Sequence, residues 1–334
     1  MSNVLYQQEQ KIIVEHLLKF CIFKKTMSNY MGNIFNIALP VISIIIIGFI
    51  FGKIFKKSDT DVASKLAFYI FAPVMTIQVL RTGNIEFDTL GRVAIIFFTI
   101  QIILAVLIFA LGKIFKTNKN ELNAHFLTVL FTNCGYYGFP IILLTYGEKG
   151  LIIAVEYVLF FNLMTATLGV FLASETKLSF SESIKEVLKI PLIYAFIIGL
   201  ALNITKTPLP KLIDSTLVSL NSAAIPVLLT VLGLELSRID VKSNAKSVSL
   251  LVGERLILGP VIAIITILLI PLLNGLSAKV VVLESAMPTA FNALLLAKEL
   301  GGNYKIVATT VFLTTLLSPF TLSLFVLLLD KIFL

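Results

Sequence analysis

The chain has few charged residues, and this scarcity defines its class before any motif does. Of its 334 residues, 14% are charged and 57% are hydrophobic, whereas an ordinary soluble domain has roughly 25% charged residues. The mean hydropathy is +0.98. These values exclude a soluble globular fold and predict an integral membrane protein. Tryptophan is absent, so anchoring at the membrane interface falls to Tyr and Phe.

Motifs that mark enzymes are also missing. The two cysteines, Cys21 and Cys134, cannot make a zinc site, and the sequence has no H-E-x-x-H, G-x-S-x-G or Walker G-x-x-x-x-G-K-[ST] motif. Intramembrane aspartyl chemistry needs two aspartates at depth, but these aspartates fall in the links between apolar runs: Asp59, Asp61, Asp88, Asp214 and Asp240. We therefore expect no enzyme, no cofactor and no nucleotide-driven pump in this chain.

Long apolar runs recur between short polar links. A run of about 17 to 25 residues crosses a hydrocarbon core of about 30 Å. The runs predict ten transmembrane helices, at 34–52, 62–82, 93–115, 121–145, 150–173, 190–205, 212–236, 247–272, 279–299 and 304–331. The sixth is the weakest of these predictions, and no link is long enough for a soluble domain. The expected fold class is all-α integral membrane.

Positive charge predicts the orientation, because Lys and Arg stay on the cytoplasmic side when links are short. The odd-numbered links hold more than twice as many Lys and Arg as the even links and the C-terminus together. These odd links, Lys57 and Lys116 included, are expected in the cytoplasm, with both ends of the bundle outside the cell membrane. The bias explains the net charge of +8. The lipid bilayer is therefore an expected partner, and nucleic acid is not.

Residues 1–30 fit this topology poorly, since they place lysines such as Lys24 and Lys25 on the predicted outer side. The apolar stretch HLLKFCIF is too short for a span, and CIFKKT lacks the small-residue cleavage site of a signal peptide. We interpret the segment as an extension upstream of a start at Met27 or Met31. An amphipathic helix on the membrane surface is the alternative.

The two halves of the chain carry the same landmarks. PVISIIIIG begins at Pro40 and PLIYAFIIG at Pro191, and FAPVMT in the second span matches AIPVLLT in the seventh. The chain therefore divides into two five-helix repeats, 31–173 and 174–334. Because five is odd, the second repeat crosses the membrane in the opposite sense. Inverted repeats are typical of secondary transporters, whose substrate site lies near the midplane between them.

The fourth helix of each repeat contains residues that break helices. FTNCGYYGFP (131–140) holds Pro140 and two glycines, and ESAMPTAFNALLLAKELGG (284–302) holds Pro288. Proline removes a backbone donor and clashes with the preceding turn, and glycine weakens a helix. Unwound backbone at membrane depth must be buried or line a cavity. Both breaks are thus expected to meet near the centre, where half-helix N-termini suit an anion.

Polar residues near the breaks are the candidate ligands. Asn133 and Asn292 offer amide donors and acceptors to the freed backbone or to a ligand, although Asn133 as a simple helix cap is the alternative. Tyr137 is either a packing residue or a substrate contact. Asn162 shares a face with Thr165, and it is either a site residue or an interhelical hydrogen bond.

Few charges fall within the spans. Glu156 is expected near the outer surface, and Glu284 at the start of span nine. Arg255 follows an adjacent glutamate in span eight and stays open as a counter-charge for an anion. His125 is interpreted as an interfacial histidine. No span has two carboxylates near its middle, so a proton pump or a cation transporter is not favoured.

TNCGYYGFP, AMPTAFN…LAKEL and the proline of span two resemble the auxin efflux carrier family, from about residue 34 to the end of the chain. The resemblance implies two inverted five-helix repeats with crossed, broken helices four and nine. It implies export or exchange of small organic acids by an elevator motion. Helices one, two, six and seven would form the scaffold, and helices three to five and eight to ten the moving transport domain. A homodimer through the scaffold is also implied.

Residue by residue, Asn133, Gly138 and Pro140 match the family's first crossover, and Pro288 and Asn292 match the microbial form of the second. Plant members have a second proline near position 293 and a large central loop. This chain lacks both features, which argues against auxin. The substrate contacts we predict are Asn133, Tyr137, Gly138, Pro140, Asn162, Pro288, Thr289 and Asn292.

The sequence thus predicts a secondary transporter of small organic anions such as malate, malonate or an auxin-like acid. A sodium-coupled symporter of the bile-acid type, which shares crossed broken helices, is the alternative within transport. A channel or a receptor-like sensor is the alternative outside it. Sodium-dependent uptake would identify the symporter, and fast conductance or binding without counterflow would identify the others.

Overall fold

The computed structural model describes residues 39–55, 60–173, 188–239, 245–299 and 303–333, together with Lys185. The extension predicted at 1–30 lies outside them. The described residues from Val41 onward form one compact unit.

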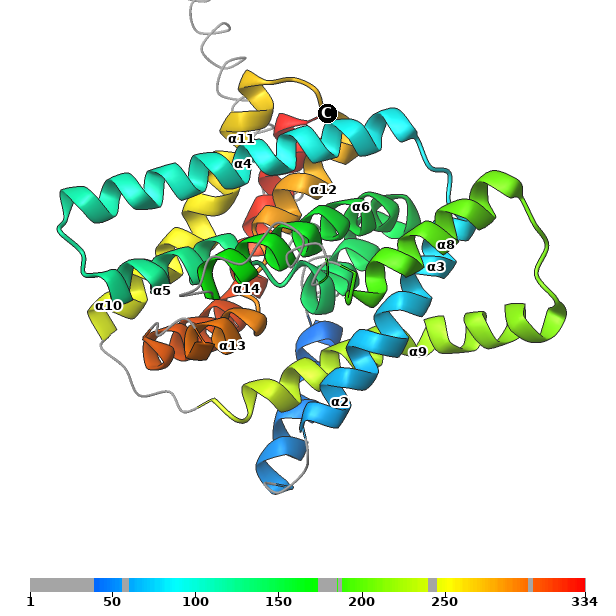
Figure 1. The fold of residues 1–334 in the computed structure, drawn as a ribbon, viewed down its shortest axis with the longest axis horizontal. Helices are drawn as coiled ribbons and strands as arrows, with labels where there is room; N and C mark the ends of the chain where they lie inside the picture. The colour runs from blue at the N-terminus through cyan, green and yellow to red at the C-terminus, as the bar shows by residue number, and fades with distance from the viewer. Residues whose placement is uncertain are drawn as a thin grey trace, which may run out of the picture. The chain divides into compact units, whose positions relative to one another are not determined.

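Helices occupy each of the ten predicted ranges (Figure 1). Their bounds are Leu39–Ile54, α2 Thr60–Leu66, η1 Ala67–Phe71, α3 Ala72–Thr82, α4 Phe87–Ile114, α5 Lys119–Leu130, η2 Cys134–Gly138, α6 Phe139–Ala173, α8 Pro191–Thr205, α9 Lys211–Leu236, α10 Ala245–Gly253, η3 Glu254–Leu258, α11 Gly259–Leu269, α12 Gly275–Ser285, α13 Asn292–Glu299 and α14 Tyr304–Ile332. In this described part, six helical segments are long and apolar enough to cross a membrane, while Leu39–Ile54 and α8 are shorter. The chain is therefore all-helical and of membrane-protein type.

Three π-helical turns, η1, η2 and η3, widen the helices. Each is followed two residues later by a proline, namely Pro73, Pro140 and Pro260. A proline ring clashes with the carbonyl one turn earlier in an α-helix. A wider turn at that point moves the carbonyl away, so the helix bends and continues. The turn before Pro140 is the one that follows the first predicted break.

Gly147 divides α6 into two helices. Its φ of 65° and ψ of −165° are non-helical, and a positive φ of this kind favours glycine because it has no Cβ. The two parts correspond to the end of predicted span four and to span five. The link between these spans is therefore a tight reversal at one residue.

Two glycines from the repeated landmarks lie at close helix contacts. A side chain on Gly48 would overlap the backbone carbonyl of Thr230 in α9, so the helix Leu39–Ile54 and α9 touch backbone to backbone. Gly199 in α8 packs on α3, where an added Cβ would lie 3.1 Å from the Cα of Ile77. Figure 1 shows α8 running beside α3. The first glycine thus lies at the contact of Leu39–Ile54 with α9, and the second at the contact of α8 with α3.

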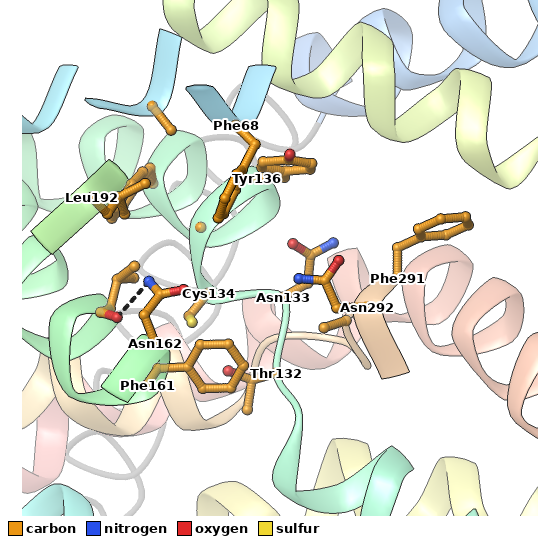
Figure 2. A pocket seen from close by; sticks show the side chains of 15 residues that line it. Phe68, Thr132, Asn133, Cys134, Tyr136, Phe161, Asn162, Leu192, Phe291 and Asn292 are labelled. Carbon is orange, nitrogen blue, oxygen red and sulfur yellow. Dashed lines mark hydrogen bonds between the residues drawn. The ribbon is translucent and has the colours of Figure 1, made fainter. Parts of the chain in front are cut away.

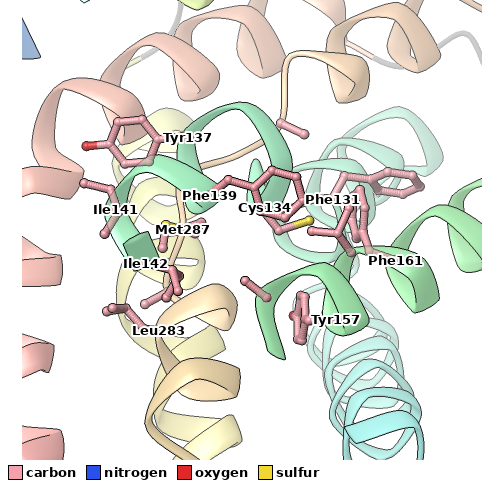
Figure 3. Close-up of a cluster of buried hydrophobic side chains, with 14 of the residues drawn as sticks. Phe131, Cys134, Tyr137, Phe139, Ile141, Ile142, Tyr157, Phe161, Leu283 and Met287 are labelled. Carbon is pink, nitrogen blue, oxygen red and sulfur yellow. The ribbon is translucent and has the colours of Figure 1, made fainter. Parts of the chain in front are cut away.

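The hydrophobic core surrounds the two breaks. Figure 3 shows Phe131, Cys134 and Phe139 from the first break beside Leu283 and Met287 from the second. Several apolar side chains on the long helices face outward instead, including these residues with their exposed fractions: Ile102 (62%), Leu269 (77%) and Phe320 (71%). An apolar outer surface of this kind suits contact with hydrocarbon.

Candidate functional site

The two broken helices are joined through their backbones. Thr132 and Thr289 form an isolated antiparallel bridge. Two hydrogen bonds of 2.8 Å each accompany it: Asn133 N–H donates to Pro288 O, and Ala290 N–H donates to Phe131 O. Each break therefore supplies the partners that the other lost when its helix unwound. Backbone groups away from water must be paired in this way.

Arg255 binds the carboxyl ends of α5 and α12, the two helices that precede the breaks. Its guanidinium is fully buried, and it donates to Val129 O (2.5 Å) at the end of α5. It also donates to Ser285 O (2.5 Å) and Met287 O (2.7 Å) at the end of α12. A helix carboxyl end carries partial negative charge. Arg255 is therefore occupied as a structural cation between the breaks, and the alternative of a free counter-charge for an anion is wrong in this structure.

The helical segments that follow the two breaks, η2 and α13, have their amino ends at the same cavity. Asn133 precedes the first turn of η2, and Asn292 is the first residue of α13. Amino ends carry partial positive charge and unpaired N–H groups. The partial charges of the half-helix ends are therefore separated in space. Arg255 covers the negative carboxyl ends, and the positive amino ends lie beside a cavity.

That central cavity has a volume of about 60 Å³, and it lies between the breaks, helix two and helix five. Figure 2 shows the side chains of Asn133 and Asn292 close together on one side of it and Asn162 on the other. Phe68 and Tyr136 cover one end. The described lining contains amides, hydroxyls and aromatic rings but no ionisable carboxylate.

Asn133 is the most buried of the three asparagines. Its side chain is 6% exposed, and its Nδ2 has no hydrogen-bond partner among the described residues. The side chain makes no cap hydrogen bond; the main-chain carbonyl instead accepts from Gly138 N–H at 3.0 Å. The simple-cap alternative for this side chain is therefore wrong. Asn162 Nδ2 donates to Val158 O at 2.8 Å, so among the described residues this donor is bonded within its own helix.

Tyr137 and Pro140 were expected at the site but lie in the core. Tyr137 is fully buried, and its hydroxyl accepts from Ser318 Oγ at 3.1 Å. Pro140 is buried behind η2. Neither lines the described part of the central cavity. For Tyr137, the structure favours the packing alternative over a substrate contact.

Gly138, Pro288 and Thr289 support the crossover without lining the cavity. Gly138 packs so closely on the carboxyl of Glu284 that a side chain would overlap it. Pro288 contributes its carbonyl to the pairing, and buried Thr289 donates its hydroxyl to Thr128 O at 3.0 Å. Their geometry makes them positioning residues.

Tyr136 was not predicted from the sequence. It lines the central cavity, whereas Tyr137 next to it points into the core. A spacing of three residues from Asn133 could have indicated it, because residues at i and i+3 share a helix face. The sequence offers no other reason to choose Tyr136 over Tyr137 as the residue that lines the cavity.

The structure gives the surroundings of three titratable residues within the predicted spans. Glu284 lies in the last turn of α12 beside the break and not at a helix start, and both of its oxygens lack partners among the described residues. Glu156 is 1% exposed, so its side chain is buried within the protein. His125 contacts Glu254 through Nδ1 and Oε2 at 2.6 Å.

The protein has two further cavities that are larger than the central one. The wide cavity, of about 450 Å³, shares Phe68, Tyr136, Phe291 and Asn292 with the central cavity. A third, the Gln78 cavity of about 220 Å³, shares no described lining residue with the central one. The central cavity therefore adjoins the wide cavity and is separate from the Gln78 cavity.

The sequence is similar to known transporters. The family model described as membrane transport protein matches residues 33–326. An uncharacterized transporter of Methanocaldococcus jannaschii is 27% identical over 300 residues, covering 86% of this chain and 96% of the relative. An uncharacterized transporter of Methanothermobacter thermautotrophicus is 31% identical over 193 residues, covering 58% of this chain and 63% of that relative.

Proposed function

Because the chain belongs to the membrane transport protein family, the auxin efflux carriers, we propose that it is a secondary transporter of small organic anions. Transport across a membrane by a multi-pass protein follows from the family and the apolar helices. We further propose that the substrates are small organic anions, that the fold is an inverted repeat and that transport occurs by an elevator mechanism.

The pairing of the breaks is the observation that carries this proposal. It places the positive ends of two half-helices and three asparagine amides around one cavity with no carboxylate in its described lining. Helix amino ends and amide N–H groups bind carboxylates well. A cation would find no opposing charge in the same place. Small substrates fit better than large ones, because about 60 Å³ holds only the head of a carboxylic acid.

Equivalent contacts in the two halves favour ten spans in two inverted repeats. The contacts of Gly48 and Gly199 pair helix one with seven and helix six with two. The bridge between Thr132 and Thr289 pairs helix four with nine. Exchanging the two repeats turns the contact of helix one with seven into that of helix six with two, and leaves the pair of helices four and nine unchanged, as a two-fold axis in the membrane plane would require.

An elevator motion would carry the paired breaks past helices one, two, six and seven. In this structure, the central cavity adjoins the wide cavity, whose lining includes Lys65 and Arg238. Both residues lie in or beside links predicted to be cytoplasmic. We take the conformation as inward-facing, with the Gln78 cavity on the other side as part of the opposite access route.

Counterflow in proteoliposomes tests the function. Vesicles are preloaded with malate, malonate, citrate, lactate or indole-3-acetate, and uptake of the matching labelled acid is followed with and without sodium and a proton gradient. We expect counterflow with one acid and its loss in Asn133→Ala. Exposed Asn274, whose side chain makes no cap hydrogen bond, supplies the control Asn274→Ala, which should behave as wild type.

Four results would contradict parts of the proposal. Unchanged counterflow in correctly inserted Asn133→Ala would remove that residue from the site. A strict sodium requirement would favour the bile-acid type of symporter. Absence of counterflow with every acid would overturn the substrate class, and ion conductance in the same vesicles would replace the carrier with a channel.

A further inference from the structure

Glu235 is a buried carboxyl group on the access route to the central cavity. It lies in the last turn of α9, is 4% exposed and lines the wide cavity. Its Oε2 has no hydrogen-bond partner among the described residues. Tyr136, which separates the wide cavity from the central one, lines the same space. The carboxyl therefore borders the space that adjoins the central cavity.

The contacts of Ser64 allow two protonation states of Glu235. Ser64 Oγ lies 2.6 Å from Glu235 Oε1 and 2.9 Å from Thr60 O. A hydroxyl has one proton to donate. If Ser64 donates to Thr60 O, the short contact to Glu235 requires a proton on the carboxyl. If Glu235 is a carboxylate, Ser64 turns its proton toward Oε1 and the bond to Thr60 O is lost.

Other titratable or charged groups line the wide cavity beside Glu235: Asp61, Lys65, Tyr69, Tyr136, Arg238 and Tyr304. Lys65 Nζ pairs with Asp61 Oδ2 at 2.6 Å, and Arg238 Nη2 donates to Phe55 O at 3.1 Å. Glu235 forms no ion pair with any residue in the described ranges. Its charge, when present, is therefore directed at the cavity and not at a fixed cation.

We propose that Glu235 is a proton-binding site that controls access of the anion to the central cavity, an inference that rests on the proposed function. The carboxylate takes a proton from water in the wide cavity, and the neutral acid donates to Ser64 and lets an anion pass. Loss of the proton to the same water restores a negative charge that repels the anion. Helix seven belongs to the proposed scaffold, so Glu235 does not cross the membrane with substrate. The proton acts from one side and is not cotransported.

The test measures counterflow of the accepted acid while the pH is varied on one side of the vesicle at a time, across the range in which protein carboxyl groups titrate. In wild type, we expect a fall of about tenfold as pH rises on the side of Lys65, the size of the repulsion between unit charges about 10 Å apart at an effective dielectric constant of about 20. Glu235→Gln should keep the acidic rate at every pH. The matched control Asp61→Asn, a carboxylate of the same cavity that is paired with Lys65, should keep the wild-type profile.

A spectroscopic readout separates this proposal from the proposed function. Infrared difference spectra of the purified protein, recorded between acidic and alkaline buffer, should contain a protonated-carboxyl band that Glu235→Gln lacks and Asp61→Asn retains. Absence of a band specific to Glu235 would overturn the proposal even if the protein transports none of the acids tested. A wild-type pH profile in Glu235→Gln, or an equal loss of pH dependence in Asp61→Asn, would overturn it too. Presence of the band without counterflow of any acid would contradict the transport function alone.

Discussion

The two breaks interrupt their helices with different residues. In the first, Pro140 lies beyond the break, the π-helical turn η2 follows at once, and Asn133 is 6% exposed. In the second, Pro288 lies within the break and provides a carbonyl to the first, and Asn292 opens α13 as an exposed residue. The first break thus supplies a buried side-chain amide without a partner for its Nδ2 among the described residues, and the second an exposed one. Only their mutual pairing makes either conformation stable at membrane depth.

Arg255 is common to both breaks, so its removal should have the largest effect. Arg255→Leu leaves three buried carbonyls without a donor, and each charged hydrogen bond contributes about 1.5–3 kcal/mol. We expect the free energy of unfolding to fall by more than about 3 kcal/mol, measured by thermal unfolding in detergent. Lysine cannot present a planar fork of donors. The free energy of unfolding of Arg255→Lys should therefore lie between those of wild type and Arg255→Leu.

Arg92 provides the matched control for that change. It pairs with Asp88 at the surface, where an ion pair contributes about 0–1 kcal/mol. Arg92→Leu should therefore shift unfolding little. Equal effects of the two substitutions would mean that Arg255 does not hold the half-helix ends together.

A methyl group at Gly138 would push the first break against the second. It would overlap the carboxyl of Glu284, whereas a methyl group at Gly135 would meet no atom within 4 Å. We expect Gly138→Ala to lower the free energy of unfolding by about 1–3 kcal/mol, as overpacking does. Gly135→Ala, three residues earlier in η2, should be near neutral. If both variants unfold at the same temperature, the contact between the breaks is looser than described.

Tyr136→Phe makes the two breaks more alike, because the aromatic rings that both offer to the central cavity would then all lack a hydroxyl. We expect a few-fold change in counterflow rate and no change in unfolding. Tyr137→Phe should do the reverse, since it loses only the buried bond from Ser318, which contributes about 1 kcal/mol. The opposite pattern would assign the substrate contact to Tyr137, as the sequence predicted.

Much of the fold could be predicted because its causes are local. Hydrocarbon requires long apolar runs, and prolines and glycines disturb the helix in which they stand. These rules placed helices at the ten ranges and both breaks at the right segments, and the family followed from the motifs around them. Site residues were harder. The structure brings Asn133, Asn162 and Asn292 to one cavity but places Tyr137, Gly138, Pro140, Pro288 and Thr289 around it as supports.

By itself, the sequence determined the membrane class, the helical segments and the two interruptions. The tertiary structure decided which interruption pairs with which carbonyl, that Arg255 binds three carbonyls, and that Tyr136 faces the cavity. The reason is physical. Apolar length and proline act within one turn of their own helix, but a buried polar group must find a partner, and here that partner lies in the other half of the chain.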